Sequence, residues 1–178
     1  MDLMEAVKRR YSHKQPFSDT AVPLEHLLQI SEAGLMAPTG INSQCVHLII
    51  LENKNAIAPV LTASASKSLE SAPTAIALFT DSVGQTGMKN FEIEDYSAAA
   101  ENILLAATAL GYASVWLDSP YFSEAAQKAV CKALRVPETF SLRVMLPIGI
   151  PAEPGIRRPK KPFRERVFLN IYGEKAPE

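Results

Sequence analysis

Residues 94–117 read EDYSAAAENILLAATALGYASVWL and contain the strongest structural signal of the sequence. Its acidic start suits the positive end of a helix dipole, and Gly111 stands where a helix commonly ends with a glycine. The residues between are apolar nearly all round, which is typical of a helix buried in a core. The apolar run is interrupted by Glu101 and is shorter than the roughly 20 residues that a membrane span needs. We therefore predict a core helix from about Glu94 to Leu110, followed by a strand at 113–117.

The hydrophobic pattern predicts further helices and strands on both sides of this core helix. Helices are expected at residues 3–10, from Pro23 to before Pro38, at 56–65 and after Ser123, and strands are expected at 45–51, 74–79 and 142–150. Strands separated by helices indicate an α+β fold, and no internal repeat or change of composition points to a second domain. We expect one domain that spans residues 1–178.

The C-terminal part, from about residue 151, is predicted to be an extended arm. Proline fits neither the interior of a helix nor an interior strand. Five prolines follow one another here, Pro147, Pro151, Pro154, Pro159 and Pro162. Large apolar residues come next, Phe163, Val167, Phe168, Leu169, Ile171 and Tyr172. They are too many for a free tail, so we expect them to cover a partner subunit in a homodimer. The alternative is that the tail folds back on its own domain.

Composition excludes several classes of protein. The chain has 178 residues, 47% of them hydrophobic and 21% charged, which is ordinary for a folded globular domain. A net charge of -1 gives no electrostatic footprint for a nucleic acid, so no nucleic-acid partner is expected. The two cysteines, Cys45 and Cys131, lie far apart and have none of the spacing of a disulfide framework. With no signal peptide and no membrane span in the pattern, we expect a cytoplasmic protein without membrane contacts.

Common catalytic signatures are missing from the sequence. It contains no Gly-x-Ser-x-Gly elbow, no Walker loop and no Gly-x-Gly-x-x-Gly after a strand. The histidines His13, His26 and His47 fall in three different elements, and only Cys45 and His47 would share a strand face. Two ligands do not make a metal site, so no metal is expected and this pair is interpreted as a packed cysteine beside a surface histidine.

A first polar cluster, Arg9–Lys14, lies where the first helix ends. Cations complement the C-terminus of a helix, so the segment has a purely structural interpretation. The functional alternative is a phosphate clamp, because an arginine offers a planar fork for two oxygens, and Ser12 and Lys14 add donors.

Two more clusters carry alternatives of the same kind. Residues 37–44 read APTGINSQ, which suits a simple turn, yet Asn42 and Gln44 each carry the donor and acceptor needed to bind the edge of a heterocycle. Residues 157–162 read RRPKKP, which suits a solvated charge run. In an extended arm, however, alternate side chains project to one side and can close over a phosphate.

Together these clusters resemble the nitroreductase family. The family pattern has Arg-x-Ser-x-Lys/Arg after the first helix and Pro-Ser-Ser/Gly-x-Asn-x-Gln after the second, here Arg10–Lys14 and Pro38–Gln44. It also has a long apolar helix ending at Leu-Gly and a basic, proline-rich segment near the C-terminus. The resemblance implies a mixed, mainly antiparallel sheet flanked by helices, an FMN cofactor and a homodimer with flavin sites between the subunits.

Matched residue by residue, the resemblance implies a set of cofactor-binding positions. The FMN phosphate and ribityl contacts fall on Arg10, Ser12, Lys14, Arg158 and Lys160, and the flavin-edge contacts fall on Asn42 and Gln44. The turn Pro38, Thr39 and Gly40 would approach the flavin of the other subunit, whereas Trp116, Leu117, Asp118 and Ser119 would lie against the ring. Lys67 is the candidate for a cation toward the pyrimidine carbonyl. No side chain is expected to act as a catalytic group, because the flavin carries the chemistry.

Some residues depart from the family pattern. Cys45 and Val46 stand where the family commonly has Pro and Trp, and Gln15-Pro16 is one residue longer than usual before Phe17. Larger relatives also carry an inserted helical region that narrows the pocket, and this chain is too short to hold much of it.

The resemblance implies reduction of a small-molecule electron acceptor, such as a nitroaromatic or a quinone, with NADH or NADPH as hydride donor in a ping-pong cycle. The alternatives are another reaction of the family, such as flavin fragmentation or reductive dehalogenation, and a flavin-binding module with little turnover. A phosphate-binding protein without flavin is a further alternative.

Overall fold

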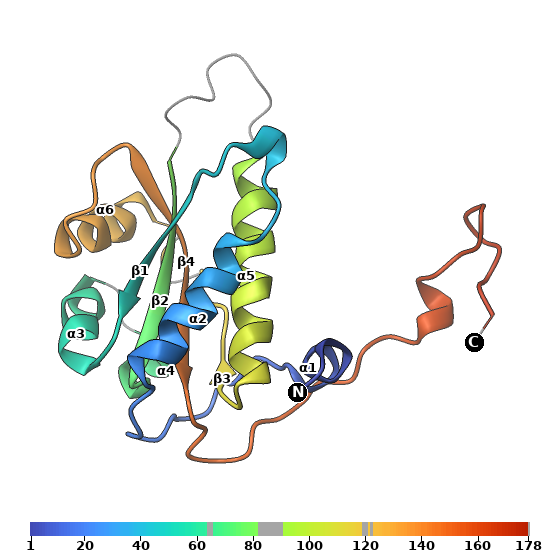
Figure 1. Cartoon of the computed structure of the whole chain (residues 1–178), viewed down its shortest axis with the longest axis horizontal. Coiled ribbons are helices and arrows are strands. Elements are labelled where there is room, and N and C mark those ends of the chain that lie inside the picture. Colours follow the sequence, from blue (N-terminus) through green and yellow to red (C-terminus); the bar gives the residue numbers. More distant parts are fainter. Residues whose placement is uncertain (64–65, 82–90, 119–120, 122, 178) are drawn as a thin grey trace.

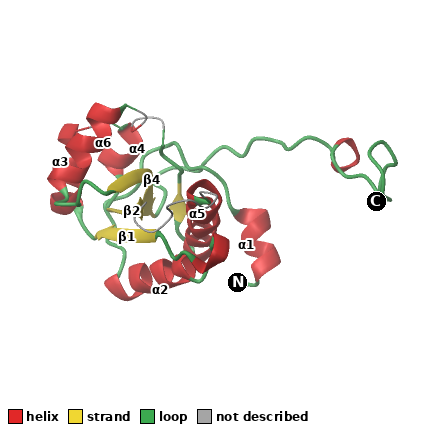
Figure 2. Ribbon diagram, turned by 90° about the horizontal axis from the view of Figure 1, so that it is seen from above, coloured by secondary structure: helices red, strands yellow, loops and turns green. Residues whose placement is uncertain are grey.

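The chain folds into three layers, with a sheet between two layers of helices (Figures 1 and 2). The computed structural model describes residues 1–63, 66–81, 91–118, 121 and 123–177. The helices are α1 (Leu3–Arg9), α2 (Leu24–Leu35), α3 (Lys54–Ala63), α4 (Lys67–Ser71), α5 (Glu92–Ala109) and α6 (Glu124–Ala133), with short 3₁₀ turns η1 (Gly40–Asn42) and η3 (Phe163–Glu165). The strands are β1 (Val46–Leu51), β2 (Thr74–Asp81), β3 (Ala113–Ser114) and β4 (Phe140–Gly149).

The sheet has the order β1-β2-β4-β3, and each pair of neighbouring strands is antiparallel. β2 is buried along almost its whole length because both of its faces are covered. Ile76 and Leu78 pack into a core with α2 and α5, whereas Ala77 and Phe79 pack into a second core with α3 and α6. The predicted α+β class with a mainly antiparallel sheet is confirmed.

The predicted core helix is confirmed as α5, with Gly111 in the left-handed conformation (φ 90°) just after its end. Two helices are capped at their N-termini: Asp2 caps α1 by accepting from the backbone of Glu5, and Ser123 caps α6 by accepting from the backbone of Ala126. The short helix α4 was not predicted. Among the described residues, no helix combines the length and the apolar character that crossing a membrane requires.

The predicted strand at 142–150 is confirmed as β4, and Pro147 lies inside it, opposite Ala75 of β2, so the assignment of Pro147 to the arm is wrong. Met145 exchanges both backbone hydrogen bonds with Leu117 on the other side, so the nitrogen of Pro147, two residues on, faces that side as well. Proline has no N–H to donate. The pairing with the chain at 113–117 is therefore broken into β3 and an isolated bridge at Leu117, and the predicted five-residue strand is not continuous.

Beyond β4 the chain runs out as an extended arm that reaches away from the sheet and helices (Figures 1 and 2). The arm first pairs with the segment after α1, where Ser18 donates to the carbonyl of Ile150 and Ala152 donates to that of Pro16. Near its end it turns back on itself, with Phe168 bridging to Lys175. The predicted extended course from about residue 151 is thus what the structure shows.

Candidate functional site

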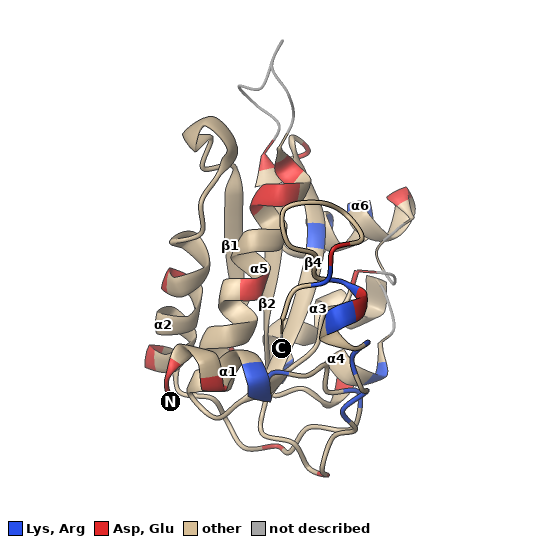
Figure 3. Cartoon of the chain, turned by 90° about the vertical axis from the view of Figure 1, so that its right-hand side faces the viewer, with Lys and Arg blue, Asp and Glu red and all other residues tan. Residues whose placement is uncertain are grey.

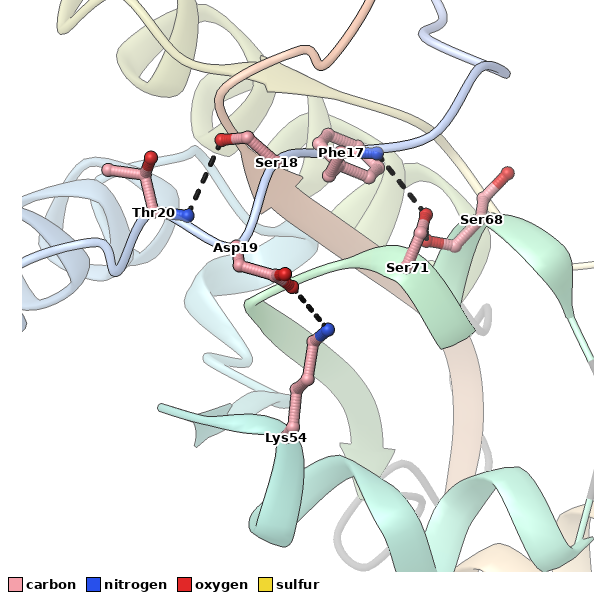
Figure 4. Close-up of polar contacts among 7 residues, drawn as sticks. All are labelled: Phe17, Ser18, Asp19, Thr20, Lys54, Ser68 and Ser71. Atoms are coloured by element: carbon pink, nitrogen blue, oxygen red, sulfur yellow. Dashed lines mark hydrogen bonds and ion pairs between the residues drawn. The ribbon is translucent and has the colours of Figure 1, made fainter.

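The segment after α1 is pinned along its length to the body of the protein. The backbone of His13 donates to the carbonyl of Ser114 over 2.9 Å, which ties the segment to β3. Farther along, the backbone N–H of Phe17 donates to Ser71 Oγ, and Lys54 pairs with Asp19 at 2.5 Å (Figure 4). The Lys54 ammonium lowers the pKa of the Asp19 carboxyl below its usual range.

The interior side of this segment is filled by His13, whose side chain is fully buried. Its ring lies edge-on to Phe17, with 4.8 Å between the centroids, and its Nε2 lies 3.2 Å from the carbonyl of Pro16. Ser12 and Lys14, on either side of His13, are exposed. A buried residue between two exposed ones therefore turns the two predicted phosphate ligands outward.

Arg157 joins the arm to the end of α1. Its guanidinium donates to the carbonyl oxygens of Lys8, at 3.0 Å, and of Arg9, and it lies 5.6 Å above the ring of Tyr11. These carbonyls are at the C-terminal end of the helix, where a cation is favourable. Gly155 allows the backbone of the arm to approach Tyr11 closely, since a Cβ at this position would stand 2.0 Å from the Tyr11 ring.

The contacts of Arg157 with the end of α1 bring two of the polar clusters of the sequence together, residues 9–14 and residues 157–162. Figure 3 shows Lys and Arg in blue at the end of α1 and along the arm. Arg10 uses its Nε for an ion pair with Glu101 of α5, at 3.0 Å, which leaves the two terminal nitrogens of its fork. No carboxylate among the described residues pairs with Lys14, Arg158 or Lys160, and all three are exposed. These four residues, Arg10, Lys14, Arg158 and Lys160, form a cationic set that is available to bind an anion.

The second predicted cluster forms a tight turn between α2 and β1. Ile41, Asn42 and Gln44 all have positive φ, at 51°, 57° and 49°, which is unusual for residues with a side chain. Gly40 lies so close to α5 that a Cβ would stand 2.3 Å from the ring of Phe91. Gln44 Nε2 donates to Asn42 Oδ1 over 3.3 Å, so the two amides lie side by side.

The turn is held by Asp95, a buried residue in the first turn of α5. Its carboxylate accepts from the backbone N–H of Gly40, at 2.7 Å, from the hydroxyl of Ser43, at 2.8 Å, and from the thiol of Cys45, at 3.4 Å. Burial raises the pKa of the Cys45 thiol, and the neighbouring Asp95 contributes in the same direction. Cys45, a departure from the family pattern, is thus a neutral donor to this carboxylate.

A pocket of about 330 Å³ opens beside the turn. Its wall is made by residues of α2, the turn, β1 and α5, namely Gly34, Leu35, Ala37, Pro38, Thr39, Asn42, Gln44, Val46, Asp95 and Ala99. Four of the predicted flavin-facing residues, Pro38, Thr39, Asn42 and Gln44, are thereby brought to one pocket, and Gly40 donates a hydrogen bond to Asp95 of its wall.

The remaining predicted positions are more scattered. The Trp116 indole donates to the Asp118 carboxylate over 3.0 Å and lies 6.0 Å from Tyr96, so these residues form a fixed surface beside α5. Leu117 is bound to Met145 by two backbone hydrogen bonds. Lys67 is the exposed first residue of α4, and among the described residues no hydrogen bond or ion pair connects it to the other predicted positions. Ser119 lies outside the described residues.

Within one chain, the cationic set and the pocket are attached to different faces of α5. Arg10 of the cationic set forms an ion pair with Glu101, whereas the turn beside the pocket donates a hydrogen bond from Gly40 to Asp95. Residues six apart on an α-helix are rotated by about 240° and separated by about 9 Å along the axis. The described part of a single chain therefore carries two candidate half-sites, the cationic set and the pocket, which do not close around one cavity.

Sequence reasoning missed two residues that organise these half-sites. Asp95 was interpreted only as an acidic residue favourable to the helix dipole, and Arg157 could not be distinguished from Arg158 in a basic run. Other polar residues have local partners: His26 Nδ1 lies 2.7 Å from the hydroxyl of Tyr112, and His47 packs on Phe140. The described residues contain no group of three side chains able to hold a metal ion.

Comparison with known proteins gives concordant results. Residues 7–82 and 61–150 match the Nitroreductase family. A protein of Methanothermobacter thermautotrophicus, provisionally named an NADH dehydrogenase/NAD(P)H nitroreductase, is 31% identical over 159 residues, which are 88% of this chain and 82% of the relative.

Solved structures agree with the sequence match. An FMN-dependent nitroreductase from Clostridium difficile superposes with a TM-score of 0.79 at 25% identity, covering 95% of this chain and 99% of that one. A structure from Desulfovibrio desulfuricans, described provisionally as a nitroreductase in complex with FMN, gives a TM-score of 0.75 at 25% identity, covering 97% and 98% of the two chains. With the family pattern matched over most of its length, the chain belongs to the nitroreductase family.

Proposed function

We propose that the chain is an FMN-dependent NAD(P)H oxidoreductase that reduces nitroaromatics, quinones or similar small acceptors by a ping-pong mechanism. The observation that carries the proposal is the cationic set at the junction of α1 and the arm. Arg157 holds this junction, while Lys14, Arg158 and Lys160 pair with no acid among the described residues. Exposed cations gathered in this way repel one another unless an anion joins them.

The chemistry of the donors fits the phosphate end of FMN. The terminal nitrogens of Arg10 and the fork of Arg158 can each bind two phosphate oxygens, and Ser12, Lys14 and Lys160 add single donors. The amides of Asn42 and Gln44, which lie side by side, carry donors and acceptors suited to the flavin edge. The family relatives whose names include FMN or NAD(P)H support the same cofactor and the same hydride donor.

When bound, FMN supplies the hydride chemistry, and the protein supplies binding and orientation. In this proposal the cationic set fixes the phosphate, and Trp116–Asp118 provides a rigid surface beside the ring. Asn42 and Gln44 place donors where negative charge develops on reduction. NADH or NADPH and a small electron acceptor then use the same open pocket in turn. Two free cysteines suit the reducing cytoplasm that this chemistry implies.

A comparison of FMN with riboflavin tests the phosphate assignment directly. Riboflavin lacks the phosphate but keeps the ring, so we expect FMN to bind the purified protein at least tenfold more tightly. Arg158→Ala combined with Lys160→Ala should abolish most of this difference, because each charge-assisted contact contributes about 1.5–3 kcal/mol. Equal affinities for the two flavins in the unmodified protein would contradict the assignment.

Turnover distinguishes an enzyme from a flavin-binding module. With FMN bound, steady oxidation of NADH or NADPH should require an added nitroaromatic or quinone, and initial rates should give parallel double-reciprocal lines. Flavin binding without such turnover would favour the module, and flavin consumption would favour a fragmenting enzyme.

We also propose that the protein is a homodimer whose two half-sites complete one another. The arm exposes large apolar side chains, with Phe163 56%, Ile171 64% and Tyr172 88% accessible. Its backbone hydrogen bonds from Pro162 to Ala176 join the arm to itself, and the arm points away from its own domain (Figure 2). On the body, α1 and α2 expose Leu3, Met4, Val7, Leu24 and Leu28. A second copy that covers these surfaces would also bring its turn toward the cationic set of the first.

A further inference from the structure

We infer that Asp95 is a positioning residue, which fixes the shape of the 38–45 turn and thereby the placement of Asn42 and Gln44 in the flavin pocket. The inference rests on the proposed function, because it assigns a role toward the flavin. Asp95 is not part of the family pattern at Pro38–Gln44 and lies on another element, α5.

The first support is the number and kind of contacts that one carboxylate makes. Asp95 is only 2% accessible, and its two oxygens accept from Gly40, Ser43 and Cys45. The first of these bonds comes from a backbone N–H and the others come from side chains. A carboxylate can satisfy three donors because it only accepts, whereas an amide offers a single acceptor oxygen. The choice of an acid at this position is therefore specific.

The second support is the conformation that these bonds hold. The contacts to Asp95 enclose the left-handed residues Ile41 and Asn42, with Gly40 before them and Ser43 after them. Residues in this region cost free energy and persist where the surrounding structure imposes them. Without the carboxylate, the backbone between Thr39 and Gln44 would relax to more ordinary angles, and the two amides would turn away from their present direction.

The third support is that Asp95 is itself immobile. Its own N–H donates to the carbonyl of Phe91 within the first turn of α5. In that turn, Glu92 is also buried and pairs with Arg143 of β4, and its carboxylate accepts from Thr80 of β2. The N-terminal end of α5 is thus fixed to the sheet through Glu92 and to the 38–45 turn through Asp95. The sheet, the helix and the turn form one rigid frame around the pocket.

The decisive variant is Asp95→Ala, studied first without flavin. We expect the amide hydrogen of Gly40 to exchange with solvent at least tenfold faster, because its acceptor is gone. At saturating FMN we expect flavin reduction by NADH or NADPH to slow by about tenfold to a hundredfold, since displacing groups by about 1 Å has effects of this size. The midpoint potential of the bound flavin should shift as well.

Two further variants keep the test independent of folding. Ser43→Ala removes one donor and leaves the buried carboxylate with the other two, so smaller changes in the same direction are expected. Asp95→Asn keeps the shape and should restore part of the reduction rate lost in Asp95→Ala. The matched control is Asn102→Ala, which removes a hydrogen bond between the same helix and Ala33 of α2, away from the turn. It should lower the melting temperature without changing the flavin potential.

The ratio of FMN to riboflavin affinity should be the same in Asp95→Ala as in the unmodified protein, because the phosphate contacts lie elsewhere. Faster Gly40 exchange with an unchanged potential and reduction rate would overturn the positioning role and leave a purely structural one. An unmodified protein that bound no flavin would instead overturn the proposed function. The link between Asp95 and the turn would still be tested by Gly40 exchange.

Discussion

At the scale of single residues, the candidate site depends on side chains that bond to the backbone. Arg157 is such a residue, because its guanidinium is committed to the carbonyls of Lys8 and Arg9. The sequence correctly indicated a basic arm, but a run of two arginines does not reveal which one binds the helix end. That distinction depends on where Tyr11 and Gly155 meet, which is a property of the folded chain.

We expect Arg157→Ala to weaken FMN binding by about threefold to tenfold, although Arg157 is not assigned to the phosphate. The lost hydrogen bonds are exposed to solvent and contribute about 1 kcal/mol each, and without them the arm would no longer be held beside α1. Fluorescence titration of FMN measures the effect. Arg9→Ala is the matched control, since Arg9 pairs with Glu5 and its loss removes the same charge from the same region. Equal losses in both variants would mean that only net charge matters.

Tyr121 gives a prediction about stability. Its hydroxyl is buried and has no hydrogen-bond partner among the described residues, and burial raises its pKa to about 12. Because this value lies above that of the unfolded chain, the unfolded chain loses the Tyr121 proton first, and stability falls as pH rises from about 10 toward 12. Tyr121→Phe removes a buried hydroxyl that has no partner among the described residues, so it should raise the free energy of unfolding by about 1 kcal/mol at neutral pH and reduce its fall above pH 10. Denaturant unfolding at several pH values checks both parts, and a large loss of stability at neutral pH would indicate a hidden partner.

At the scale of elements, prediction from the sequence succeeds where several signals along one segment indicate the same structure. The core helix α5 could be predicted because its acidic start, apolar body and glycine end all agree. The interrupted pairing of β3 could not, because Pro147 sits in an otherwise regular apolar strand and its effect depends on which side its nitrogen faces. The turn at 38–45 was recognised as a turn, but its left-handed shape depends on Asp95, which is 50 or more residues away in sequence.

The packing of α2 against α5 yields a prediction at this scale. A Cβ on Gly34 would lie 2.6 Å from Ile103 Cγ1 and 2.8 Å from its Cδ1. Gly34→Ala should therefore destabilise the protein by about 1–3 kcal/mol, although alanine is the better helix former. Ile103→Val removes the Cδ1 atom, so the double variant should lose less stability than the sum of the two single variants. Strictly additive losses in thermal unfolding would show that the helices do not meet at this point.

At the scale of the whole molecule, the arm is the feature whose large apolar side chains a single chain leaves uncovered. Its apolar residues are exposed, and burying them would contribute about 25 cal/mol per Å² of apolar area. We expect truncation after Pro162 to abolish the dimer in sedimentation and to reduce FMN binding together with it. The alternative of a tail folded on its own domain predicts an unchanged mass and weaker folding. A truncated protein that remained a dimer with bound FMN would show that the arm does not join the subunits.

One anaerobic absorption experiment can decide whether this chain is a flavin-dependent oxidoreductase. Purified protein saturated with FMN is mixed with NADH, and separately with NADPH, and an acceptor such as a quinone is then added. We expect the visible flavin band to be lost with at least one of the two donors and to return when the acceptor is added. A protein that binds no FMN, or whose flavin band is unchanged by both donors, would contradict the proposed function.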